Sequence, residues 1–136
     1  MKKIFLSFLL TVLLSIQSLA VTFLVTGKNS ESLLKTQVTT ALPKNLGEIS
    51  ISVFDDLHIP YKGGTYGLTE LFGLGQTTEI ISDTEMKAYG WCFSINKLTP
   101  DTMSDQTMVN ENSDVIHWYY AYAHYKDGLW IGQCVK

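Results

Sequence analysis

The fold of this chain is decided by the stretch from Tyr89 to Asn96, which reads Tyr-Gly-Trp-Cys-Phe-Ser-Ile-Asn. Large apolar residues alternate along it with small or polar ones, and side chains on a β-strand point to opposite faces in turn. The period of two therefore predicts a half-buried strand. We expect its core face to carry the larger side chains, namely Tyr89, Trp91, Phe93 and Ile95.

A second alternating stretch runs from Asp114 to about His124. One of its faces carries Ile116, Trp118, Tyr120 and Tyr122, and the other carries Val115, His117, Tyr119 and Ala121. Both faces contain large apolar side chains, so the pattern predicts a strand but leaves the choice of its core face open.

Most of the remaining chain has the pattern of strands and turns. Strands are expected at residues 21–26, 48–54, 77–82, 106–109 and 129–135. The strand at residues 48–54 is predicted from the alternation of Ile49, Ile51 and Val53 with polar residues. Residues 33–40 fit a strand or a short helix equally well. Asp83-Thr84-Glu85 and Lys126-Asp127-Gly128 predict hairpin turns, since Asp-Gly suits positive φ angles.

The pattern predicts one short helix, from Thr65 to Phe72, with Leu68, Leu71 and Phe72 at helical spacing. Lys62-Gly63-Gly64-Thr65 before it has the composition of a flexible linker. The expected fold class is therefore α+β, a β-rich antiparallel sheet with one short helix.

The chain begins with Lys2-Lys3, an apolar run from Ile4 to Ile16 and Ser18-Leu19-Ala20. This order predicts a secretory signal peptide over residues 1–20, cleaved after Ala20. The apolar run is too short for a membrane anchor. We expect a secreted or periplasmic protein whose residues 21–136 form a single domain without a membrane span.

The net charge of the chain limits which kinds of partner can be expected. After Lys2 and Lys3 are removed, 8 of the 10 lysines remain against 13 acidic residues, which gives a formal charge of −5. An acidic surface repels phosphate backbones, so nucleic acid is not expected to bind. The chain has no arginine. A site for an anion would have to be built on lysines or backbone amides.

Cys92 and Cys134 are the only two cysteines. In an exported protein such a pair predicts a disulfide, and closing a loop of about 42 residues would stabilise the fold by about 4 kcal/mol in the chain-entropy model. Two free thiols, or thiol ligands for a soft metal, are the alternatives. No Cys-x-x-Cys motif is present, which argues against a redox enzyme.

The order of Trp91 to Asn96, then Met108-Val109, then Asp114-Val115-Ile116-His117-Trp118-Tyr119 resembles the transcobalamin C-terminal-like domain family. The resemblance implies a β-grasp-like fold and a contact with a corrinoid. In that family a larger helical domain shares the ligand, so this chain would offer half a site. Two positions depart from the family pattern, because Lys97 and Ser113 stand where glycines are expected.

The candidate ligand-binding residues are aromatic. Tyr119, Tyr125 and Trp130 are the best candidates for a stacking platform. Trp91 and Asn96 are added because the family resemblance marks them. Core packing is the alternative for each aromatic residue, and turn formation is the alternative for Asn96.

Metal and catalytic chemistry have little support in the sequence. His117 and His124 are seven residues apart, which puts them on opposite faces of one strand, and His58 stands alone, so no metal site is expected. The carboxylates are scattered, and no Gly-x-Ser-x-Gly motif marks a nucleophile. We expect the protein not to be an enzyme.

The sequence therefore predicts an exported, non-catalytic binding or adaptor domain. Its partner would be a small ligand or a protein, and a flat amphipathic molecule such as a corrinoid is the first candidate. Cobalamin is the one cofactor considered. The alternative is a secreted protein-interaction module, an effector or inhibitor, that uses an exposed strand edge.

Overall fold

The structure is a computed structural model that describes residues 19–136. The predicted signal peptide, residues 1–20, lies almost wholly outside the described residues. The main sheet has six strands in the order β2-β1-β10-β8-β7, with β11 paired to β10. Its strands are β1 (Val21–Thr26), β2 (Ser32–Val38), β7 (Thr77–Ser82), β8 (Glu85–Ile95), β10 (Val115–Lys126) and β11 (Leu129–Val135).

The main sheet is mixed, which corrects the expectation of an antiparallel one. β1 runs parallel to β10, with Phe23 opposite Ile116 and Val25 opposite Trp118. The other pairs in this sheet are antiparallel. The stretch of residues 33–40, for which strand and helix were both open, is a strand as far as Val38, since it overlaps the edge strand β2.

The face of β8 that alternation predicts to be buried is its core face, and the matching face of β10 is buried with it. Trp91 and Phe93 of β8 lie opposite Tyr120 and Trp118 of β10. Trp118 is 1% exposed, and it shares its face with the buried Phe23 of the neighbouring strand. We call this the helix face, because α1 covers it. The other face, which carries Leu24, Cys92, Ser94, His117 and Tyr119, is the open face.

The helix α1 (Leu46–Asp56) replaces the strand expected at residues 48–54. Its buried residues recur at helical spacing: Leu46, Gly47, Ile49, Ser50, Val53 and Phe54. The Asn45 side chain caps the helix by accepting a 2.8 Å hydrogen bond from the Glu48 amide. The Phe54 ring meets Phe23 edge to face at 5.7 Å. The strand prediction was wrong because a helix can bury Ile49 and Val53 one turn apart as well as a strand can.

Residues 67–71 form a strand, so the helix expected at residues 65–72 is also wrong. β4 (Tyr61–Gly64), β5 (Gly67–Leu71) and β6 (Leu74–Gly75) make a three-stranded antiparallel sheet. The predicted linker is thus part of β4 and its turn. Leu68 and Leu71 are buried, and Leu71 is fully covered. This small sheet packs beside α1 and β8, and Gly47 approaches the Thr65 carbonyl so closely that a Cβ there would overlap it.

A short two-stranded sheet pairs β3 (Lys44–Asn45) with β9 (Met108–Val109). The 3₁₀ helix η1 (Ser104–Gln106) precedes β9, so the strand expected at 106–109 is confined to its last two residues. Within residues 19–136 none of the helices combines the length and the apolar character needed to cross a membrane.

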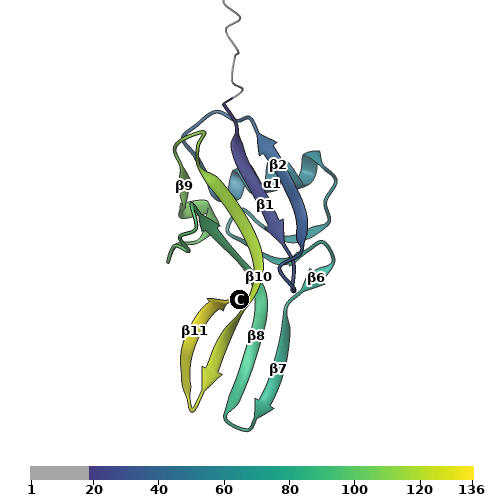
Figure 1. Cartoon of the computed structure of the whole chain (residues 1–136), viewed down its shortest axis with the longest axis vertical. Helices are drawn as coiled ribbons and strands as arrows, with labels where there is room; N and C mark the ends of the chain where they lie inside the picture. Colours follow the sequence, from purple (N-terminus) through teal and green to yellow (C-terminus); the bar gives the residue numbers. More distant parts are fainter. Residues whose placement is uncertain (1–18) are drawn as a thin grey trace, which may run out of the picture.

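The lower half of the main sheet extends away from the helix as an arm (Figure 1). We use this name for residues 77–89 and 122–133. Its strand order is β7-β8-β10-β11, and the turns of the two predicted hairpins lie together at its tip, where the Asp127 amide donates 2.9 Å to the Thr84 carbonyl oxygen. Asp127 and Gly128 have φ angles of 50° and 84°, as the predicted turn requires. The chain ends at the level where the arm leaves the body of the domain (Figure 1).

Candidate functional site

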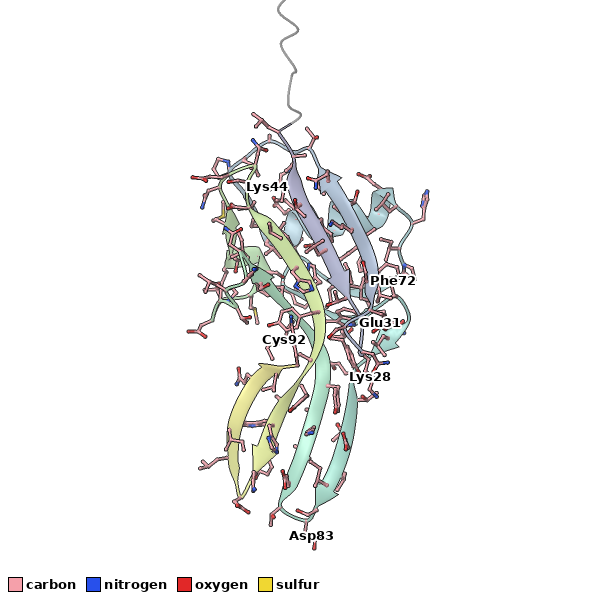
Figure 2. The ribbon with its side chains drawn as sticks, viewed as in Figure 1. Lys28, Glu31, Lys44, Phe72, Asp83 and Cys92 are labelled. Atoms are coloured by element: carbon pink, nitrogen blue, oxygen red, sulfur yellow. A yellow bond between two sulfur atoms is a disulfide. The ribbon has the colours of Figure 1, made fainter. Side chains whose placement is uncertain are left out.

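A disulfide joins Cys92 of β8 to Cys134 of β11, with the Cα atoms 5.9 Å apart. Since β10 lies between these two strands, the bond crosses β10 on the open face. The end of β11 is thereby held over the open face, and Tyr119 and Ala121 are each only 4% exposed. Cys92 lies at the level where the arm begins (Figure 2).

Three hollows meet at this disulfide, and Cys134 lines all of them. We name them by their walls: the aromatic hollow, the small-residue groove and the lysine hollow. Their volumes are about 510, 390 and 470 Å³. Ligand pockets in proteins typically enclose about 300–1,000 Å³. Each hollow is therefore large enough to hold a small molecule or a part of one.

The aromatic hollow lies along the edge of β8 that β7 leaves uncovered, since β7 pairs with β8 only as far as Tyr89. Trp91 and Phe93 of β8 form one wall, and Tyr66 from the β4–β5 turn forms another. The Trp91 indole is fixed by a 2.7 Å hydrogen bond from its Nε1 to the Leu74 carbonyl. The polar side chains that line the hollow are Thr99, Asp101, Thr102 and Gln133.

The small-residue groove has a floor made by two cross-strand pairs, Ala121 with Gly90 and Ala123 with Ala88. Side chains this small leave space above the centre of the open face. The groove continues from the disulfide toward the arm, where Thr78 of β7 forms part of its wall.

Beyond the groove, four apolar side chains form a row across all four strands of the arm. Ile80, Met86, Tyr125 and Trp130 are successive cross-strand neighbours on the open face. We call them the apolar row. The Tyr125 and Trp130 rings meet at 5.2 Å, and Ile80 and Trp130 are 70% and 52% exposed. On the opposite face of the arm, His124 is bonded to Glu85 at 2.7 Å and the Tyr89 and Tyr122 rings meet at 5.4 Å.

The lysine hollow lies on the open face of the upper sheet, on the other side of the disulfide. It is lined by Ser94, Lys97, Thr99, His117, Tyr119, Cys134 and Lys136. The Lys136 ammonium lies 4.4 Å from the centre of the Tyr119 ring. Burial of the ring, and then the Lys136 charge, lower the pKa of His117 below its ordinary value of 6.5, so this histidine is neutral at pH 7.

The three histidines lie in separate places. His117 shares a 2.8 Å hydrogen bond with Thr26 on the open face, whereas His124 lies on the opposite face with Glu85. His58 is an exposed residue just after α1. Among residues 19–136 no three His, Cys, Asp or Glu side chains are grouped so that they could hold a metal ion.

Asn96 lies in a turn, which was the alternative to a ligand contact for this residue. Its backbone has a φ of 51°. Its side-chain Nδ2 donates a 2.8 Å hydrogen bond to Asp114, and its side-chain Oδ1 accepts one from the Val115 amide. Asp114 also accepts from the Asn110 and Glu111 amides. Burial acts to raise the pKa of Asp114, but these three hydrogen bonds outweigh it and lower the pKa below 3.8.

The other predicted ligand-binding residues divide among the hollows. Trp91 is 9% exposed and lines the aromatic hollow, while Tyr119 lies under Lys136 in the lysine hollow. Tyr125 and Trp130 come together in the apolar row. Sequence reasoning missed the hollow-lining residues Tyr66, Thr99, Gln133, Ser94, Lys97 and Lys136. The one sequence signal for this group is the pair of glycines at 63 and 64, which precede the turn at Thr65-Tyr66.

Comparison with known proteins gives one structural neighbour. No family model matches the chain, and no curated protein matches it. A crystal structure from Ruminococcus gnavus ATCC 29149, described as a "putative metal binding protein", covers 74% of this chain and 94% of its own. The two are 21% identical, with a TM-score of 0.49.

Proposed function

We propose that this protein is a non-catalytic binding domain and that the aromatic hollow is its ligand site. The observation that carries the proposal is the composition of that hollow. Tyr66, Trp91 and Phe93 offer aromatic surface, while hydroxyl and amide groups converge on it from other walls. Ligand sites commonly combine such an apolar wall with a few polar groups that fix orientation.

The chemistry of the walls indicates a flat amphipathic ligand. An extended ring system would stack on the aromatic side chains, and its polar edge would meet Thr99, Thr102 and Gln133. Asp101 is the one acidic side chain that lines the hollow, so a neutral or cationic edge fits better than an anionic one.

A corrinoid is the specific candidate for this ligand. The resemblance of residues 91–119 to the transcobalamin C-terminal-like family supports it. The strand order β2-β1-β10-β8, with β1 parallel to β10 and a helix after β2, supports the β-grasp-like architecture that the resemblance implies. A molecule as large as a corrinoid would fill the hollow and extend from it, as expected for half of a shared site.

Titration with cyanocobalamin tests the proposal. Wild-type residues 21–136, with the disulfide intact, should give a saturable change in visible absorbance. Tyr66→Ala should weaken binding by about tenfold, because it removes one stacking wall. Leu57→Ala is the matched control, since Leu57 is exposed to a similar degree, 49% against 55% for Tyr66, and lies outside the hollow.

An absence of any absorbance change would remove the corrinoid from consideration. The broader proposal then depends on native mass spectrometry of protein purified from its own source. A retained small molecule that Tyr66→Ala releases and Leu57→Ala keeps would support the aromatic hollow. Retention that is equal in both variants would overturn it.

Export from the cytoplasm is part of the proposal. It is supported by the signal-peptide pattern of residues 1–20 and by the Cys92–Cys134 disulfide, since disulfides persist in oxidising compartments. Amino-terminal sequencing of the protein from the medium or the periplasm should begin at Val21. A chain that retains Met1 in the cytoplasm would contradict export.

The alternative function, a protein-interaction module, is favoured by one observation. β7 is an edge strand whose six residues are all exposed, and the apolar row begins on it. Unpaired edges are templates for strand addition. If an extended segment of a partner pairs with β7, Ile80→Lys should abolish that association and leave cyanocobalamin binding unchanged.

A further inference from the structure

The lysine hollow differs in charge from the rest of this acidic protein. Two lysines line it together with the neutral His117 and three hydroxyl-bearing residues, and no acidic side chain lines it. The whole chain has 13 acidic residues and only 10 lysines. A concave surface with one sign of charge raises the local concentration of ions of the opposite sign.

Ser94 is the second feature that points to a ligand. Its side chain is 5% exposed and lines the lysine hollow. The buried serines Ser50 and Ser104 donate to backbone carbonyl oxygens at 2.7 Å, and no such bond is found for the Ser94 hydroxyl. Because every fully covered side-chain oxygen among residues 19–136 has a partner, the Ser94 hydroxyl retains contact with the space of the hollow. A hydroxyl that reaches this space can donate to a group that enters the hollow.

The side chains around Ser94 are held in place. Lys136 stacks on the Tyr119 ring, and the disulfide two residues before it fixes the chain over the open face. The Tyr119 hydroxyl lies 2.7 Å from that of Thr99, and His117 is held by Thr26. Lys97 follows the turn at Asn96 with a φ of 67°. The hollow thus exists before a ligand binds.

We propose that the lysine hollow binds the oxyanion group, a carboxylate or a phosphate, of a small molecule. Lys97 and Lys136 supply the positive charge, and Ser94 donates a hydrogen bond at the base of the hollow. Lysine acts as a point charge and lacks the planar fork of arginine, so both oxyanion shapes can be accommodated. The volume of about 470 Å³ leaves room for the rest of the molecule.

This site lies on the other side of the disulfide from the aromatic hollow. Its existence does not depend on the ligand proposed there. The two tests separate the proposals. A phosphate titration detects binding in the lysine hollow, and the absorbance of cyanocobalamin detects binding in the aromatic hollow. Tyr66→Ala should leave phosphate binding unchanged.

The test is a titration of oxidised, isotope-labelled protein with inorganic phosphate, followed by NMR chemical shifts of backbone amides. Sodium acetate provides the carboxylate arm, and sodium chloride at equal ionic strength controls for screening. We expect saturable shifts concentrated at Ser94, Lys97 and His117 with phosphate, acetate or both. The arm that saturates at the lower concentration identifies the preferred oxyanion.

Three variants make the assignment specific. The double variant Lys97→Gln/Lys136→Gln should weaken binding by at least about tenfold. Ser94→Ala should weaken it by about fivefold, the value of one hydrogen bond. Lys126→Gln is the matched control, because it removes the same charge from an exposed position at the far end of β10 and should change nothing.

Several outcomes would overturn the proposal. Equal shifts with chloride would mean screening and not binding. Equal affinity in wild type and in Lys97→Gln/Lys136→Gln would exclude the lysines. Unchanged phosphate affinity in Ser94→Ala would exclude the proposed hydrogen bond and would mean that the lysines attract anions without a defined site. Because Lys97 and Lys136 are both exposed, the double variant should fold, and its unperturbed amide spectrum checks this.

Discussion

The indole Nε1 of Trp118 donates a 2.8 Å hydrogen bond to the hydroxyl of Ser50, and this hydroxyl donates 2.7 Å to the Leu46 carbonyl. The relay joins the central strand β10 to the first turns of α1. Both side chains are buried, at 1% exposure each. One serine therefore satisfies the only polar atom of the largest core residue.

Ser50→Ala should lower the free energy of unfolding by about 1–3 kcal/mol, because the Trp118 N–H would remain buried without an acceptor. Chemical denaturation monitored by tryptophan fluorescence measures the loss. Ser52→Ala, on the exposed side of the same helix, is the control and should change stability by less than about 0.5 kcal/mol. Equal effects of the two variants would contradict the relay.

Gly47→Ala should destabilise the domain by about 2–3 kcal/mol. The added Cβ would overlap the Thr65 carbonyl oxygen, and backbone cannot move aside as a side chain tip can. Thermal unfolding by circular dichroism checks this. Gly67→Ala is a suitable comparison, since nothing lies within 4 Å of a Cβ at that position. If the two substitutions cost the same, the close approach of α1 to residue 65 would be incorrect.

Replacing both cysteines, in Cys92→Ala/Cys134→Ala, should lower the free energy of unfolding by about 4 kcal/mol, because the disulfide closes 42 residues of chain. It should also weaken phosphate binding, since Lys136 would no longer be held over Tyr119. Reduction of the wild-type protein with dithiothreitol should reproduce both effects. A loss under about 1 kcal/mol would mean that β-pairing alone holds β11 in place.

Stability should depend on Asp114 at acid pH. Its pKa is lowered in the folded state, so its contribution is complete above the unfolded pKa of about 4 and disappears as the pH falls through the folded value. Urea denaturation between about pH 5 and pH 2 should show this fall, and Asp114→Asn should flatten it. Asp105→Asn, at an exposed position of η1, should retain the wild-type slope.

Two tryptophans named as candidate ligand contacts should differ sharply in their effect on stability. Trp91→Ala should cost about 3–5 kcal/mol, because Trp91 is packed in the core and bonded to Leu74. Trp130→Ala should change stability by less than about 0.5 kcal/mol, since its ring is half exposed on the arm. Similar melting temperatures for both variants would contradict this division.

The long strands could be predicted because period-two alternation matches burial on one face of a sheet. The hairpin turn at Asp127-Gly128 also fixes register, since a two-residue turn pairs Lys126 with Leu129 and Tyr125 with Trp130. The meeting of Tyr125 and Trp130 was therefore within reach of the sequence. The parallel pairing of β1 with β10 was not, because no local pattern marks a partner so distant in the chain.

The helix α1 was missed although a local signal exists. Asn45 followed by Glu48 is a capping pattern that announces a helix start, and it competes with the alternation of Ile49, Ile51 and Val53. Tertiary burial decides between them, since Ser50 and Phe54 also face the core. The hollows were beyond prediction, because their walls come from separate loops and from the end of β11.

The pairing of Phe23 with Ile116 has a consequence for how the molecule assembles. The strand made first after residue 20 finds its central neighbour only when nearly all of the chain has been synthesised. Contacts of such high sequence separation slow folding, because a large loop must close before they form. Until β10 is available, the edge of β1 that will pair with it has unpaired backbone groups. Such an edge can pair with another chain, so during that interval a chaperone would have to prevent self-association.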